Sequence, residues 1–502
     1  MLRGPTCCGR APAVPLQRKA RGRRLLQDAR AGPVRRDYCW PGAGRGRPGP
    51  GPGQGLRVYS WGSSESVFII ADSDLMAVQN ENGPRSARAL TAKGRGTRAA
   101  LLDAALEVFN RQGVFAASVS EISRRCGLAQ GTFYQYFHNK EQVLLELADR
   151  AITSFWERAR GLELESQDLA GRLGRAVELL FSHTRDHYAF HRILGELELI
   201  DPVTIAYYDS MARFFRGFIR DQAAAGSIRP IDPNLFAYGL MGMAHFFFPD
   251  WGAKIKSFRL EQGVALTVDL IRRGIMGPSP WPRPADGSAA SPPPGAAGQD
   301  QAAAELSQGQ KTRQAIFQAA ERIFGQLGYN RASIADITRE AGVAQGTFYV
   351  HFKSKLELLE GVIAFQSQSL RRELRRATQG LSDRRDAERE GMLAFYRFIR
   401  HHRELYRVVA ECEAISPRAA KMYYSRMANN YLDYVRQGAA QGQLRDLPAS
   451  FVVRSLMGFN HMIGLKWLIW NSSPYAEVPP PLLAEAVEFV LHGLDPAGNF
   501  PE

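Results

Sequence analysis

Two copies of one short segment hold the side chains whose types and spacing favour specific binding. Residues 127–137 read GLAQGTFYQYF, and residues 342–352 read GVAQGTFYVHF. Each copy places amide, hydroxyl and phenol groups close together, and a lysine follows three residues later, Lys140 or Lys355. These groups donate and accept hydrogen bonds, so the chemistry that they offer is recognition.

No set of residues in the sequence supports catalysis or metal binding. The sequence has no His, Asp and Glu cluster with metal-ligand spacing, and no Ser or Cys in a recognisable nucleophile elbow. The pairs Glu196/Glu198 and Glu411/Glu413 do not favour a catalytic dyad, because alternate residues diverge on a helix. We therefore expect no enzyme activity, no metal and no cofactor.

The similarity between the two segments extends far beyond them. Aligned without gaps, residues 97–147 and 312–362 share 21 of 51 positions, and residues 191–198 match 406–413 at the same offset. Later segments match at an offset one residue larger, which a single insertion explains. This period is far longer than that of a solenoid repeat. The chain is therefore two copies of one complete protein, called here the first and second repeats.

The net charge of +14 does not by itself indicate a nucleic-acid partner. Residues 1–57 hold thirteen Arg or Lys and two Asp, a net of +11, so the remaining chain carries only +3. This segment is rich in Arg, Gly and Pro and lacks the apolar density to fold. We expect residues 1–90 to be a disordered tail. Two origins stay open for residues 1–75: a basic extension, or upstream sequence before a start at Met76.

Two further features concern location. No stretch approaches the roughly 18 apolar residues that span a bilayer, so we expect no membrane contact. The five cysteines show no metal-type spacing, and their use fits a reducing cytoplasm.

The chain divides by composition and periodicity. A segment dense in Pro, Gly and Ala separates the repeats and is typical of a semi-extended linker. Nearly every periodic segment in each repeat has helical spacing, for example Leu101, Ala105 and Phe109, so the predicted fold is all-α. We expect a tail (1–90), a DNA-binding domain (91–145), a helical effector and dimerisation domain (146–276), a linker (277–304), a second DNA-binding domain (305–360) and a second effector domain (361–495).

The start of each repeat predicts a helix-turn-helix unit. A first helix breaks at Gly113 or its counterpart, and a short helix follows. The pattern Ser118-x-x-Glu121 is a capping box, and Ser333-x-x-Asp336 is a near version of it. Each short helix is expected to stop at a glycine in the left-handed conformation, residue 127 or 342. A further short helix then starts at residue 130 or 345, and a long fourth helix starts at residue 140 or 355.

The pattern G-[LV]-A-Q-G-T-F-Y-x-x-F-x-x-K after a capped short helix resembles the TetR/AcrR family of transcriptional regulators. The resemblance covers the DNA-binding domain of both repeats and is weaker in the helical segments that follow. It implies a three-helix DNA reader, a long fourth helix, and a helical core where a small molecule binds and a second unit pairs. Family members usually carry Ser where Ala129 and Ala344 stand, so one expected cap or phosphate contact is missing in both repeats.

Within this resemblance, the third helix presents its side chains to base edges in the major groove. Glutamine can pair with adenine through two hydrogen bonds, and an apolar or methyl group can contact the thymine methyl. Gly131 and Gly346 would permit close approach to the duplex. The expected readers are Gln130, Thr132, Gln135 and Tyr136 in the first repeat and Gln345, Thr347, Val350 and His351 in the second.

Other positions match family residues that usually contact phosphates, which position a protein without reading sequence. They are Tyr134, Tyr349, Lys140 and Lys355, and Ser118 and Ser333 would add contacts at a helix N-terminus. Each has a plainer alternative: the tyrosines pack on the first helix, the lysines are solvated helix starts, and the serines are caps alone. The phenylalanines at 133, 137, 348 and 352 are expected in the core.

The helical halves carry many aromatic and histidine side chains, and an apolar cavity with few polar groups is the usual form of a small-molecule site. Most such residues are expected to be core or interface. The candidates for ligand contact are His191, Tyr208, His245, Trp251, Tyr423, His461 and Trp467.

The resemblance therefore predicts a bacterial DNA-binding transcriptional regulator, a repressor released by a small hydrophobic effector. Its partners would be a double-stranded DNA operator, the effector, and its own second repeat in an intramolecular pseudo-dimer, with a homodimer of chains as the rival arrangement. The alternative function is a ligand-binding or interaction protein that keeps the fold without binding an operator. An enzyme that uses the helical cavity has no supporting residues.

Overall fold

The computed structural model describes residues 57–60, 67–70, 77–79, 91–164, 168–196, 202–249, 257–281, 307–471, 473 and 475–496. These residues belong to two compact units, which divide between Ala87 and Arg88.

The unit before Arg88 contains a small antiparallel sheet. Its strands are β1 (Arg57–Ser60), β2 (Val67–Ile70) and β3 (Ala77–Gln79), in the order β1-β2-β3. The expected disordered tail of residues 1–90 therefore differs from the structure at these strands. The sequence VFII of β2 explains the difference, because β-branched and aromatic residues favour strands. All other residues of this tail lie outside the described residues.

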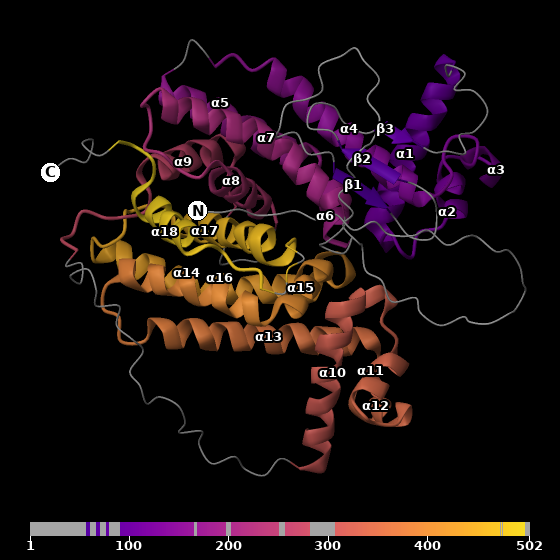
Figure 1. Cartoon of the computed structure of the whole chain (residues 1–502). Helices are drawn as coiled ribbons and strands as arrows, with labels where there is room; N and C mark the ends of the chain where they lie inside the picture. The colour runs from indigo at the N-terminus through magenta and orange to yellow at the C-terminus, as the bar shows by residue number, and fades with distance from the viewer. Residues whose placement is uncertain are drawn as a thin grey trace, which may run out of the picture. The chain divides into compact units, whose positions relative to one another are not determined.

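The helices follow the same order in both repeats (Figure 1). The first repeat consists of α1 (Ala92–Gln112), α2 (Val119–Arg125), α3 (Gln130–Phe133), α4 (Lys140–Arg160), α5 (Leu169–Asp186), α6 (Tyr188–Glu196), α7 (Pro202–Ala224), α8 (Pro233–Phe247) and α9 (Leu260–Arg273). The second consists of α10 (Gln308–Arg331), α11 (Ile334–Glu340), α12 (Gln345–His351), α13 (Lys355–Thr378), α14 (Arg384–His401), α15 (Arg403–Ile415), α16 (Pro417–Ala440), α17 (Ala449–Gly464) with its π-helical extension η1 (Leu465–Ile469), and α18 (Pro480–His492). The prediction of two tandem all-α repeats is confirmed for the part of the chain after residue 90 that the structure describes.

Each repeat has a small head and a larger helical half. The heads are α1–α3 and α10–α12, and α4 or α13 leads from the head into the half. In the halves, α5 packs on α9, α7 on α8, and α13 on both α14 and α16. None of the helices in the described residues is long and apolar enough to cross a bilayer.

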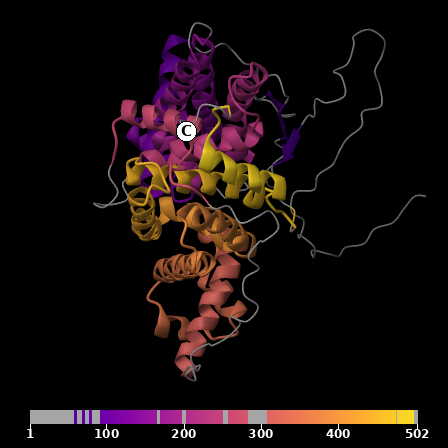
Figure 2. The ribbon, with the colours of Figure 1, turned by 90° about the vertical axis from the view of Figure 1, so that its left-hand side faces the viewer.

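The two repeats pack against each other mainly through α8 and α17. In both views α17 and α18, drawn in yellow, lie between the first repeat and the rest of the second (Figure 1, Figure 2). Nearly every residue of α8 is buried, because one side faces its own repeat and another faces α17. A helix that is hydrophobic all round is stable only in such a position.

Two equivalent glycines mark the crossing of α8 and α17. A Cβ atom added to Gly242 would lie 2.0 Å from the carbonyl oxygen of Gly458, and one added to Gly458 would lie 2.2 Å from that of Gly242. No larger residue fits at either position while the backbones stay this close. The reciprocal contact is that expected of two like helices related by an approximate two-fold axis.

The ends of α9 and α18 repeat this reciprocity. The amide of Met276 donates to the carbonyl of Leu491 at 2.9 Å, and the amide of Asp495 donates to the carbonyl of Arg272 at 2.8 Å. Leu491 and Arg272 occupy corresponding places at the ends of their helices. The two repeats therefore exchange matching backbone hydrogen bonds.

The expected linker of residues 277–304 begins with residues that contact the second repeat. The amides of Gly277 and Ser279 donate to the carbonyls of Gln443 and Gly442 at 2.8 and 2.9 Å. The buried Arg385 donates to the carbonyl of Ser279 at 2.7 Å. Residues 277–281 are thus packed structure and not free linker, and residues 282–304 lie outside the described residues.

Candidate nucleic-acid interface and effector cavity

The second helix of each head is capped by the serine that the sequence indicated. The hydroxyl of Ser118 accepts from the amide of Glu121 at 3.1 Å, and that of Ser333 accepts from the amide of Asp336 at 3.0 Å. Only Asp336 also accepts from its cap, from the Ser333 amide at 3.2 Å. The complete capping box is therefore in the second repeat, opposite to the expectation.

Glu121 bonds elsewhere, which explains the incomplete box in the first repeat. Its carboxylate pairs with Arg111 and Arg124. The hydrogen bonds from these guanidinium groups hold the pKa of Glu121 below its usual value. The hydrogen bonds from Ser333 and then Arg339 lower the pKa of Asp336 in the same way. Both carboxylates are thus ionised at neutral pH and lie beside helix starts, where negative charge is favourable.

The turn into the third helix has the predicted geometry in both heads. Gly127 and Gly342 each have φ of 67°, the left-handed conformation that favours glycine. Ala129 and Ala344 precede α3 and α12 and make no side-chain cap. The first amides of these two helices therefore receive no hydrogen bond from the side chain of the preceding residue.

The third helix separates core from exposed residues as expected. Phe133 and Phe348 are fully buried. Tyr134 and Tyr349, the next residues, are 52% and 56% exposed, and Val350 is 79% exposed. Exposed apolar and aromatic side chains that gather on one surface are typical of an interaction site. The alternative in which the tyrosines pack on the first helix does not account for this exposure.

The remaining predicted readers lie around the same surface. Gln130, Gln135 and Gln345 are exposed, and Thr132, Tyr136, Thr347 and His351 are half-buried. Gly131 and Gly346 have no atom within 4 Å of an added Cβ. Packing within the chain therefore does not require glycine there, whereas close approach of a duplex backbone would.

The two lysines are not placed for the phosphate contact that the resemblance implied. The ammonium of Lys140 donates to the carbonyls of Val114, Phe115 and Ala117 at 2.8, 2.9 and 3.3 Å. A lysine has three donors, and the connection between α1 and α2 takes all of them.

The equivalent Lys355 makes the same kind of contact in the second head. It donates to the carbonyls of Tyr329 and Ala332 at 2.8 and 2.7 Å and lies 4.3 Å from the centre of the Tyr329 ring. Burial lowers the pKa of Lys355. Both lysines thus hold the turn of their head, which corrects the expectation of phosphate contact and also the alternative of a solvated helix start.

The candidates for ligand contact in the first repeat lie in hydrogen-bonded core. The imidazoles of His183 and His191 both bond the hydroxyl of Tyr207 at 3.0 Å. Tyr208 stacks on Trp470 of the other repeat with ring centres 5.5 Å apart, and His245 stacks on His461 at 6.3 Å. The predicted contacts at His191, Tyr208 and His245 therefore belong to the core and to the contact between repeats.

The remaining candidates divide between interface and cavity. Trp467 packs edge-on against Tyr238 of the first repeat, with ring centres 6.2 Å apart, and Trp251 lies outside the described residues. Tyr423 and His461 line a cavity of about 430 Å³ in the second repeat. Its other walls come from α13 to α17 and from Phe246 of the first repeat, and include Glu388, Tyr431 and Phe395.

Three important groups were not identified from the sequence: Arg454, Lys466 and Glu388. Arg454 and Lys466 are charged side chains in otherwise apolar helical sequence, whereas Glu388 lies among other charged residues of α14. Their counterparts in the first repeat are Tyr238, Asp250 and Leu173. A comparison of the repeats position by position is the signal that would have found them.

With this geometry established, the comparisons identify the heads. The family model described as "Bacterial regulatory proteins, tetR family" matches residues 101–147 and 316–362, which are the two heads and the starts of their fourth helices. The DNA-binding domain that this family model describes is therefore present twice in the chain.

Particular relatives cover only part of the chain. The HTH-type transcriptional activator FasR of Mycolicibacterium smegmatis is 34% identical over 98 residues, 20% of this chain and 45% of FasR. A fatty acid metabolism regulator protein of Bacillus subtilis is 41% identical over 58 residues, 12% of this chain and 30% of that protein. The solved regulator PfmR of Thermus thermophilus is 22% identical with a TM-score of 0.30, and the match covers 35% of this chain and 96% of PfmR. The chain thus spans less than half the length of these two sequence relatives.

Proposed function

We propose that this protein is a transcriptional regulator that binds an operator through both heads and is a repressor released by a small apolar ligand. The observation that carries the proposal is the pair of third helices, α12 and the shorter α3, which ends at Phe133 so that Tyr134 and Gln135 follow it in a turn. In each head, buried phenylalanines fix the position of the third helix. The exposed side chains are Gln130, Tyr134 and Gln135 in the first repeat, and Gln345, Tyr349 and Val350 in the second. The cavity in the second repeat supports the ligand-responsive part of the proposal.

The two heads are joined to one another by their helical halves. α1 packs on α6 and α10 packs on α15, and α6 and α15 pack on each other. We infer that a single chain acts as the two-headed unit that family members form from two chains. Intramolecular pairing is favoured because a linker of this length gives a high effective concentration.

Unequal contacts between the repeats also favour this pairing. Arg454 of α17 is 1% exposed and donates to the carbonyls of Phe246, Phe247 and Pro249, at 3.1, 3.1 and 2.8 Å. These carbonyls are available because α8 ends at residue 247. In the second repeat the corresponding helix continues through η1 to Ile469, so its carbonyls at those positions are within a helix. A pair of two second repeats would lack the open helix end that Arg454 requires.

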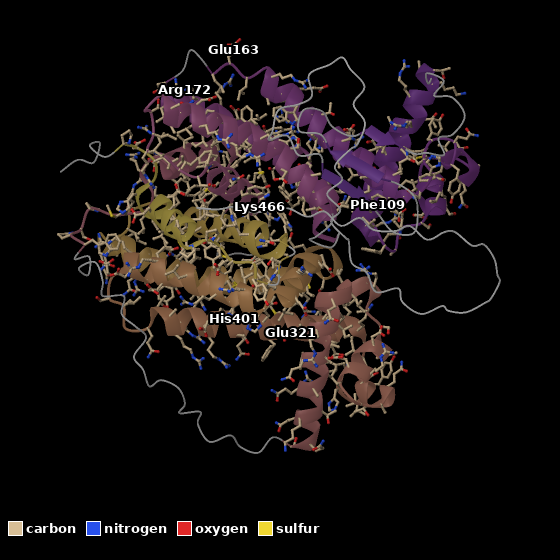
Figure 3. The ribbon with its side chains drawn as sticks, viewed as in Figure 1. Phe109, Glu163, Arg172, Glu321, His401 and Lys466 are labelled. Atoms are coloured by element: carbon tan, nitrogen blue, oxygen red, sulfur yellow. The ribbon has the colours of Figure 1, made fainter. Side chains whose placement is uncertain are left out.

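A second unequal contact involves Lys466, labelled in Figure 3, at the junction of the repeats. Its ammonium lies 3.0 Å from Asp209 and 2.9 Å from the hydroxyl of Tyr238. The second repeat has Ser425 and Arg454 at the positions of Asp209 and Tyr238. In a pair of second repeats, Lys466 would face arginine without the carboxylate, and like charges in a buried contact are unfavourable.

The consequence for DNA is an operator with two related but unequal half-sites. The first head carries Gln135 and Tyr136 where the second carries Val350 and His351. Heads of this type read half-sites about 34–36 Å apart.

The decisive experiment is a gel shift with DNA selected from random sequence, at constant salt. Gln135→Ala and His351→Ala should each relax preference in one half-site only, by about 1–3 kcal/mol. Tyr134→Ala and Tyr349→Ala should weaken binding to all sequences alike and lower the salt dependence. Sedimentation of the complex should show one chain per operator.

Two results would contradict the proposal. No sequence preference at all would favour the alternative of a ligand-binding or interaction protein without an operator. A stable particle of two chains on a symmetric site would keep the regulator and replace the pseudo-dimer by a homodimer with four heads.

A further inference from the structure

The two helical halves differ at the aligned positions that border the cavity of the second repeat. In the second repeat the cavity is lined by Arg371 of α13, Glu388 of α14 and Asn430 of α16. The aligned positions of the first repeat carry Trp156, Leu173 and Phe214. Where the second repeat has an arginine and an asparagine, the first repeat has large aromatic rings. Where the second repeat has a glutamate, the first has a leucine.

These rings form a packed cluster in the first repeat. Phe155, Trp156 and Phe214 contact one another edge-on, with ring centres 5.9 to 6.4 Å apart. Phe215 contacts Phe214 at 5.1 Å. Aromatic rings packed in this way take up space that the smaller or more flexible residues of the second repeat leave open. The indole nitrogen of Trp156 donates to Ser210 at 3.0 Å, which fixes the ring in this position.

Glu388 is the acidic group inside the second-repeat cavity. The hydroxyl of Tyr431 donates a hydrogen bond to it at 2.5 Å. No arginine, lysine or histidine of the described residues is among the groups that shift its pKa. Burial raises the pKa of Glu388 to about 7, and the bond from Tyr431 offsets part of that rise. A carboxylate in such a place is costly until a cation accompanies it.

A second polar group supports the same site. Tyr423 is 1% exposed and lines the cavity, and its buried hydroxyl has no hydrogen-bond partner among the described residues. A buried hydroxyl without a partner costs free energy, which a ligand atom can restore. The rings of Tyr423, Tyr431, Tyr406 and Phe395 surround this region. Aromatic faces of this kind attract organic cations.

The other charged groups along the cavity have partners or exposure of their own. Arg371 donates to the carbonyl of Ser367, and Arg384 donates to Gln437 and lies over the Tyr434 ring. Arg375 is exposed. The exposed Asp433 pairs with Arg436, and burial lowers the pKa of His461 to about 3, so it is neutral.

We propose that the chain binds one ligand per two heads, in the second repeat only, and that this ligand is a lipophilic organic cation whose charged nitrogen lies at Glu388. The inference rests on the proposed function only in supposing that the cavity serves the regulator. The first repeat is then the rigid partner, and only the second changes with the ligand. In a tandem chain this asymmetry is built into the sequence, whereas two identical chains carry the same residues in both sites.

Calorimetry with three probes of one chain length tests the ligand chemistry without DNA. Decylammonium, decanol and decanoate share a ten-carbon chain and differ in the charge of the head group. We expect decylammonium to bind tightest, with one molecule per chain, and decanoate to bind weakest.

Three variants of the full chain test the site. Glu388→Gln should lower the affinity for decylammonium about tenfold, the scale of one charge-assisted hydrogen bond, and leave that for decanol unchanged. Glu390→Gln is the matched control on the same helix, because this carboxylate pairs with Arg389 and does not line the cavity. Asn430→Phe installs the first repeat's residue and should abolish binding of all three probes.

The pH dependence adds an independent readout. Glu388 is ionised above its pKa of about 7, whereas an alkylamine keeps its proton up to about pH 10. The affinity for decylammonium should therefore rise between about pH 6 and 8 in the natural protein and stay flat in Glu388→Gln.

The outcomes separate this inference from the proposed function. Two decylammonium molecules per chain, tighter binding of decanoate, or equal effects of the substitutions at 388 and 390 would each overturn the inference. Expected binding together with a failed operator gel shift would instead overturn the proposed function and leave the cation site standing.

Discussion

In both heads a lysine at the start of the fourth helix bonds the carbonyls of the same connection, Lys140 in one repeat and Lys355 in the other. In the helical halves, aligned positions hold different chemistry: Tyr238 of the first repeat corresponds to the buried Arg454 of the second. The heads have stayed alike because each must form the same turn and present the same kind of helix. The halves have diverged because the same aligned position makes a different contact in each repeat: Tyr238 bonds Lys466, and Arg454 bonds the end of α8.

The largest effect is expected where the two halves still match, at the crossing of α8 and α17. Gly242→Ala places a Cβ within 2.0 Å of a backbone oxygen, so the helices must separate. The free energy of unfolding should fall by about 3 kcal/mol or more in chemical denaturation. Gly217→Ala on α7 is the control, because its Cβ meets nothing within 4 Å. A loss no larger than that of the control would show that the crossing is not close.

A smaller effect is expected where the halves differ. Arg454→Met keeps the length of the side chain and removes its donors, which leaves the carbonyls at the end of α8 without this partner. The free energy of unfolding should fall by about 2–3 kcal/mol. The control Arg436→Met removes an exposed arginine paired with Asp433 and should cost at most about 1 kcal/mol. Equal effects of the two substitutions would mean that Arg454 does not determine which repeats pair.

The smallest effect is expected within the heads, and it sharpens their similarity. Lys140→Met and Lys355→Met should each lower the free energy of unfolding by about 1–2 kcal/mol, measured by thermal denaturation. Each substitution removes charged hydrogen bonds to the turn. The exposed Lys353→Met is the control. A phosphate role would instead leave stability unchanged and reduce the salt slope of DNA binding by about 1. That result would restore the interpretation that the resemblance first suggested.

Much of the heads could be predicted because their signals are local. The cap at Ser118, the left-handed Gly127 and the buried Phe133 are each specified by residues within a few positions of one another. Local signals failed only where a more distant partner competed. Glu121 pairs with Arg111 and Arg124 and leaves the capping box incomplete, although its sequence pattern is the better match.

The helical halves were less predictable because aromatic and histidine residues occur alike in the core, in the interface and around the cavity. His191 and Tyr423 were equal candidates for a ligand contact. One of them bonds Tyr207 in the core, and the other lines the cavity. Which outcome applies depends on the volume of neighbours from other helices, such as Trp156 in one repeat and Arg371 in the other.

The sequence by itself determined the duplication, the all-helical class, the turn geometry of the heads and the identity of the exposed third-helix residues. These follow from repeated words, helical spacing and caps, all of which act over short distances along the chain. Only the tertiary structure decided that the lysines hold a turn, that Arg454 requires the open end of α8, and that a cavity lies in the second repeat where rings fill the first. Each of these depends on contacts between residues far apart in the chain, 23 positions for Lys140 and Ala117 and 208 for Arg454 and Phe246. A pattern read along one segment contains no information about such partners.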